Sequence, residues 1–132
     1  MRTVRVITLT VVAAALSFLT LQAQEGKVVK RNVVLKEDTS IPGREAVMAH
    51  VELPPGVAEG PHTHFADVFV FVEEGEITLE NEGHPTVTLK AGDVFHIAQG
   101  AVHQAINHGT TTAKLNAVFV AEKGKPLTTP VK

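Results

Sequence analysis

The sequence predicts an all-β fold built as one barrel-like domain. Apolar and polar residues alternate in a series of short runs, and Gly, Pro or Asn separates one run from the next. Such runs are typical of strands in a β-sandwich or barrel, and no stretch after residue 23 has the period of an amphipathic helix. The chain of 132 residues is long enough for one domain. Roughly eight strands in this length form one closed or nearly closed barrel that holds a small ligand.

The expected strands follow one another between residues 28 and 121. The first covers residues 28–35, and the second, residues 45–53, alternates cleanly between apolar and polar positions. An unbroken apolar run at residues 68–72 leads to a turn at Gly75. Further strands are expected at residues 77–79, 87–89, 94–98, 102–106 and 114–121. The tail, residues 123–132, is polar and broken by proline, so we expect it to be flexible and to fray.

The first 23 residues have the pattern of a secretory signal peptide. Arg2 and Arg5 precede an apolar stretch that ends near Ala23. This stretch is short for a membrane span, and Thr and Ser residues interrupt it. We expect cleavage near Ala23, and an uncleaved anchor is the alternative. The mature domain would then cover residues 24–132, be secreted or periplasmic, and have no stable membrane anchor.

The composition excludes several classes of partner and of chemistry. Removal of residues 1–23 leaves 10 basic and 14 acidic residues, so the expected mature chain has a net charge of −4. An acidic chain lacks the basic surface that nucleic acids or anionic membranes require. The chain has no Cys, Tyr or Trp, which excludes a thiol nucleophile, a thiolate metal ligand and a phenol acid or base.

Two histidines, His62 and His64, stand one residue apart just before the apolar run at residues 68–72. Residues two apart on a strand point to the same face, so their ring nitrogens can converge on one metal ion. Two such ligands bind a divalent ion weakly, and a third is therefore needed. His103, which follows the expected turn at Gly100, is the best-placed candidate.

The histidines lie in two spaced motifs that resemble those of the cupin family. The first motif spans residues 56–75, and the second spans residues 92–107. The matching residues are Gly56, His62, His64 and Gly75 in the first motif and Gly92, Gly100, His103 and Asn107 in the second. The resemblance implies a cupin double-stranded β-helix, a jelly-roll-like barrel, for residues 24–132. It also implies one mononuclear metal site formed by the three histidines.

Two positions depart from the cupin pattern. Ala98 stands where the second motif has proline, which is a minor change. Val68 stands where the first motif has a glutamate ligand, and valine cannot bind metal. The neighbouring Asp67 should point to the opposite face, because side chains alternate along a strand. Only a β-bulge that shifted the register would allow Asp67 to replace the missing glutamate.

The resemblance thus implies a site of three neutral imidazoles, from His62, His64 and His103, without an acidic ligand. A divalent ion held in this way keeps its full charge and favours anionic oxygen ligands. The expected cofactor is a divalent transition metal ion, with iron, manganese, nickel, copper and zinc left open. The alternative is a barrel that has lost its metal, in which the histidines hydrogen-bond one another or water.

His96 is a further histidine with a candidate role. It shares a side of its expected strand with Val94, near the turn that leads to His103. We interpret it as a pocket residue that shuttles protons or binds substrate, and hence as the candidate catalytic residue. The alternative is an exposed strand residue.

Three functions fit the expected site. The first is a small metalloenzyme, a dioxygenase-like oxidoreductase acting on a small, anionic, oxygen-rich molecule, in line with the oxygenases found among cupins with three-histidine sites. The second is a non-catalytic module that binds a small ligand or a metal. The third is a metal-assisted isomerase or lyase, which the shortage of acids in the expected pocket disfavours. The β-rich opening at residues 28–35 also points to a homodimer, through paired edges or swapped strands.

Overall fold

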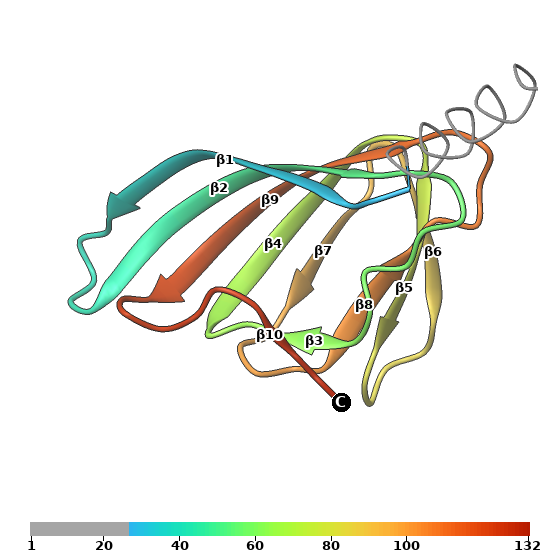
Figure 1. The fold of residues 1–132 in the computed structure, drawn as a ribbon. Helices are drawn as coiled ribbons and strands as arrows, with labels where there is room; N and C mark the ends of the chain where they lie inside the picture. The colour runs from blue at the N-terminus through green and yellow to red at the C-terminus, as the bar shows by residue number, and fades with distance from the viewer. Residues whose placement is uncertain (1–26) are drawn as a thin grey trace, which may run out of the picture.

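A computed structural model describes residues 27–132, so the predicted signal peptide at residues 1–23 lies outside the described part of the chain. The described residues form ten β-strands in two five-stranded sheets (Figure 1). The all-β prediction is confirmed. No helix within residues 27–132 is long and apolar enough to cross a membrane.

The two sheets are antiparallel throughout, and we name each after one central strand. The β2 sheet has the order β1-β2-β9-β4-β7. Its strands are β1 (Lys30–Asp38), β2 (Arg44–Leu53), β9 (Ala113–Glu122), β4 (Ala66–Glu74) and β7 (Val94–Ile97). The β8 sheet has the order β10-β3-β8-β5-β6. Its strands are β10 (Thr129–Pro130), β3 (His62–Thr63), β8 (His103–Ile106), β5 (Glu76–Asn81) and β6 (Val87–Lys90).

In both sheets, alternate side chains point inward, and together they form one apolar core. β2 and β9 pair along their whole length, and nearly every second residue of these strands is buried, as the period-two pattern predicted. The β8 sheet supplies Ile77, Leu79 and Ala105 to the same apolar cluster. Removal of this apolar surface from water is the main term that favours the fold.

The turn between β4 and β5 requires glycine at position 75, as expected. Gly75 has a φ of 77°, in the left-handed region that other residues rarely adopt. A Cβ atom at this position would also lie 3.1 Å from the Cα of Ala113 at the start of β9. The glycine therefore allows the hairpin to pass close to the neighbouring strand.

β1 lies at the edge of the β2 sheet and is exposed along its entire length. A β-bulge between Val33 and Leu35 interrupts its pairing with β2. Lys30 and Lys36 place positive charges on the same strand. Bulges and lysines on an edge strand disfavour its pairing with a second chain. The homodimer stays a prediction, and the structure disfavours one route to it, the pairing of two β1 edges.

The C-terminal tail lies along β3, whereas we expected it to fray. β10 forms an antiparallel pair with β3, and the amide of Val131 donates a hydrogen bond of 3.0 Å to the carbonyl of Pro61. Pro130 is tolerated here because β10 is an edge strand. A strand of two residues is too short to show alternation, which is why the sequence pattern missed it.

Asn107 joins three segments of the barrel from a fully buried position. Its side-chain Nδ2 donates hydrogen bonds of 2.8 Å to the carbonyls of Leu53 and Thr111. Its Oδ1 accepts a hydrogen bond of 2.8 Å from the amide of Gly109. Asn107 and Leu53 are both 0% exposed, so water cannot replace the Asn107 amide as the partner of the Leu53 carbonyl. The last residue of the second motif is therefore structural.

We expect Asn107→Ala to lower the free energy of unfolding by roughly 1–3 kcal/mol, because it leaves the buried carbonyl of Leu53 without a partner. Urea unfolding followed by circular dichroism measures the change. Asn32→Ala, at an exposed position on β1, is the control and should change the stability by about 0.5 kcal/mol or less. Equal stability of the two variants would contradict the structural role of Asn107.

Candidate metal centre

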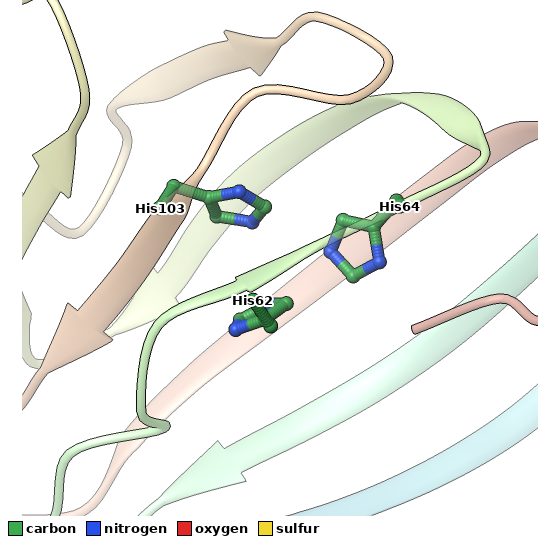
Figure 2. A group of neighbouring side chains, drawn as sticks. All are labelled: His62, His64 and His103. Atoms are coloured by element: carbon green, nitrogen blue, oxygen red, sulfur yellow. The ribbon is translucent and has the colours of Figure 1, made fainter. Parts of the chain in front are cut away.

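The three histidines of the two motifs come together on the β8 sheet. His62 begins β3 and His103 begins β8, and these two residues lie directly opposite each other in the antiparallel pair. His64 follows β3, and the three rings surround a common space (Figure 2). Their ring centroids are 4.4 to 4.9 Å apart. All three residues are buried, with exposed fractions between 5% and 7%.

Hydrogen bonds to the backbone determine which nitrogen each histidine offers. Each Nδ1 atom lies at hydrogen-bond distance from a carbonyl oxygen, and a carbonyl can only accept. The acceptors are Gly60 for His62 at 2.8 Å, Leu127 for His64 at 2.7 Å and Ala101 for His103 at 3.0 Å. Each Nδ1 therefore carries the proton, and each neutral ring keeps a lone pair on Nε2.

Burial favours the neutral form of the His64 and His103 rings. Desolvation lowers the pKa of His64 from 6.5 to about 4, although the hydrogen bond to Leu127 acts in the opposite direction. Desolvation is also the largest cause that lowers the pKa of His103. Neutral imidazole is the form that binds metal, so at neutral pH an ion does not have to displace a proton from these two rings.

The donor set fits a divalent transition metal ion. One ring nitrogen of each histidine lies within 4.8 Å of the others. Neutral imidazole nitrogens are good ligands for iron, nickel, copper and zinc. Nδ1 hydrogen bonds that fix the ring orientation are typical of histidines that bind metals. The three residues could thus hold one metal ion between them.

The position of the missing glutamate faces the same space. Val68 is 3% exposed and lines the cavity next to the histidines. The register of β4 is regular from Ala66 to Val72, so no bulge turns Asp67 inward. The Oδ1 of Asp67 instead accepts a hydrogen bond of 2.8 Å from the Nε2 of His96. Asp67 does not replace the glutamate, in agreement with the expected alternation.

His96 lies on the outer face of the β2 sheet and not in the pocket where we expected it. Its side chain is 48% exposed, and its ring stacks on Phe69 with a centroid distance of 4.8 Å. Alternation places His96 on the same side as Val94, as predicted, but Val94 is 70% exposed. The inward residues of β7 are Phe95 and Ile97, so the side that we took for the pocket is the outer one.

A cavity of about 50 Å³ opens beside the three histidines. Apolar side chains form most of its wall, including Val68, Phe95 and Phe119. The small residues Ala105 and Ala117 line the same cavity and leave this space open. A cavity needs a volume of about 10–15 Å³ to hold one water molecule, so this cavity has room for only a few heavy atoms.

Two charged residues at this cavity were missed by the sequence analysis. Arg31 and Glu59 both line it, and the Nη2 of Arg31 lies 2.8 Å from the Oε1 of Glu59. The side chain of Glu59 is 11% exposed, and its Oε2 accepts a hydrogen bond of 3.2 Å from the amide of Ala105. Glu59 lies inside the first motif, between Gly56 and His62, and this position could have indicated that it lies near the histidines. No pattern in the sequence indicated that Arg31 would reach the site from β1.

Comparison with known proteins agrees with this architecture. The sequence model of the cupin domain matches residues 49–120. A germin-like protein, subfamily 2 member 2 of Arabidopsis thaliana, is 36% identical over 88 residues, which are 60% of this chain and 40% of that protein. The matched region thus spans less than half of the length of this relative.

Solved structures show the same fold. A double-stranded β-helix protein from Klebsiella pneumoniae has a TM-score of 0.64 at 23% identity and covers 79% of this chain and 84% of its own. An oxalate oxidase in complex with glycolate has a TM-score of 0.65 at 23% identity, over 80% of this chain and 56% of that one. The cupin domain match covers more than half of the sequence, which shows that the chain belongs to the cupin family.

Proposed function

We propose that this cupin binds one divalent transition metal ion through His62, His64 and His103 and acts as an oxidoreductase on a small carboxylate, with dioxygen as the oxidant. The observation that carries the proposal is the cluster of three buried imidazoles at a cavity that an arginine also lines. When bound, a redox-active ion with no acidic ligand would supply Lewis acidity and electron transfer.

Arg31 gives the cavity its preference for an anion. A guanidinium group has five donor hydrogens, and the hydrogen bond to Glu59 uses one nitrogen of the group. The remaining donors can bind a carboxylate in a bidentate way. The oxalate oxidase of similar fold is complexed with glycolate, a small carboxylate, which supports this class of ligand. The cavity volume of about 50 Å³ limits the ligand to a few heavy atoms.

Glu59 and the apolar wall control what reaches the histidines. Glu59 offsets part of the positive charge of Arg31, so an incoming carboxylate binds the guanidinium donors that Glu59 leaves free. Phe95, Phe119 and Val68 exclude bulk water, which strengthens electrostatic contacts inside the cavity. The free donors of Arg31 and the dry wall therefore favour a small anion.

A non-catalytic module that binds a small ligand or a metal is the second candidate. It is favoured because Glu59, a carboxylate that lines the cavity, is not free to act as a base: Arg31 and the amide of Ala105 already bind it. An isomerase or lyase also needs a side-chain base that is free to accept a proton. His96, on the outer face, cannot fill that role at this cavity. The isomerase or lyase therefore ranks third.

The metal site predicts that purified protein carries about one divalent ion per chain. His103→Ala should lose most of this metal, because two imidazoles bind a divalent ion weakly. Inductively coupled plasma mass spectrometry measures the metal content and identifies the ion. His84→Ala, at an exposed turn, is the matched control and should keep the ion. A wild-type protein that takes up no divalent metal would sink the proposal.

Val68→Glu should restore an acidic ligand at a position that faces the histidines. We expect the affinity for Mn²⁺ to rise by about tenfold or more, because manganese prefers carboxylate oxygen. Isothermal titration calorimetry on metal-free protein measures this affinity. Val118→Glu, on the outer face of β9, is the control and should leave the affinity unchanged. If both variants bind Mn²⁺ alike, the acid at position 68 does not reach the ion.

Arg31→Gln should weaken the binding of glycolate or oxalate to the metal-loaded protein by about 10–100-fold, because it removes a charge-assisted contact. The metal content should stay the same. Arg44→Gln is the control, since Arg44 contacts Gln99 and Glu122 instead. Oxygen uptake with the same acids separates the two candidate functions. Tight carboxylate binding without any oxygen uptake would favour the non-catalytic module.

A further inference from the structure

His64 differs from the other two histidines in where its hydrogen-bond acceptor comes from. His62 and His103 each donate to the carbonyl two residues before them, Gly60 and Ala101. His64 donates to the carbonyl of Leu127, which lies 63 residues later in the chain. The local loop therefore fixes two of the rings, whereas the third is fixed only when the C-terminal end is in place.

The segment that supplies this acceptor, which we call the C-terminal strap (residues 127–131), is held by few contacts. Its pairing with β3 covers two residues, and one further hydrogen bond joins Val131 to Pro61. Leu127 is half-buried against the core, while residues 123–126 and 128–131 are exposed. A segment with so little buried surface opens at a small cost in free energy.

The strap contacts His64 at two points. The carbonyl of Leu127 lies 2.7 Å from Nδ1, and the hydroxyl of Thr128 lies 3.3 Å from the same atom. The shorter contact is the one that holds the Nδ1 proton, because a carbonyl can only accept. Without it, the ring of His64 loses the partner that fixes its tautomer and its orientation. Two fixed ligands and one mobile ligand would then remain.

We propose that the C-terminal strap positions His64 for metal binding, so that docking of the strap and binding of the metal favour each other. The inference rests on the proposed metal site. Hydrogen-bond partners of metal-bound histidines typically contribute 10–100-fold to metal affinity. The coupling is reciprocal by thermodynamic linkage, so the metal should stabilise the docked strap as much as the strap strengthens metal binding.

A chain that ends at Pro126 lacks the strap and tests the first half of the coupling. Full-length and shortened proteins are freed of metal and titrated with Zn²⁺ by calorimetry. We expect the shortened chain to bind Zn²⁺ about 10–100-fold more weakly while its circular dichroism spectrum stays that of a β protein. A chain that ends at Val131 is the matched control, because it is also shortened but keeps the whole strap, and its affinity should stay close to that of the full chain.

Leu127→Asp offers the same test without shortening the chain. A charge at this half-buried position should undock the strap, and we expect a similar loss of Zn²⁺ affinity. The absorption spectrum of the Co²⁺ form gives a readout that a merely structural role would not change. Its visible bands report the ligand geometry and should differ between the docked and undocked proteins.

The reciprocal half needs only the full-length protein. Hydrogen exchange of the Val131 amide, which is bonded to Pro61, should slow on addition of Zn²⁺. Equal Zn²⁺ affinity with and without the strap, or exchange that Zn²⁺ does not slow, would overturn the coupling and leave the metal site intact. Failure of the full-length protein to bind Zn²⁺ or any other divalent ion would overturn both. If both variants fail to fold, the exchange measurement decides alone.

Discussion

The hydrogen bonds between three histidine Nδ1 atoms and three backbone carbonyls are the constraint on which the site depends. Buried imidazoles need partners, and here the partners are carbonyls rather than one another. If the rings satisfied each other, as in a barrel that has lost its metal, their lone pairs would be used within the cluster. Because a backbone carbonyl accepts a hydrogen bond from every Nδ1, three Nε2 lone pairs stay available for an ion.

The charge of the site follows from strand alternation in β4. Val68 faces the histidines and Asp67 faces away, so Asp67 forms a hydrogen bond with His96 on the outer face and does not contribute to the site. The cavity nevertheless holds one negative and one positive side chain, Glu59 and Arg31, joined to each other. An ion bound by the three histidines would keep its full charge, because none of these ligands is acidic. The guanidinium group of Arg31 could then bind an anionic ligand beside the ion.

The sequence was sufficient for the parts of the site that depend on short-range rules. Period-two patterns predicted the strands, and motif spacing predicted that His62, His64 and His103 would meet. His96 shows the limit of alternation. The pattern divides the residues of a strand between two sides, but in a strand of four residues it does not tell which side faces the core. Arg31 and Leu127 show a second limit, because long-range pairing at the chain ends leaves no local pattern.

Two of the residues that sequence reasoning missed have a common physical origin. Arg31 comes from β1, the first described strand, and lines the cavity, and Leu127 comes from the segment before β10 and contacts His64, so both ends of the described domain reach the site. The motifs supply the ligand atoms from the middle of the chain. The ends supply the charge beside them and the acceptor that fixes the third ring. The proposed metal and anion sites therefore predict that a cupin with the same motifs but different terminal segments binds metal and anion with different strength.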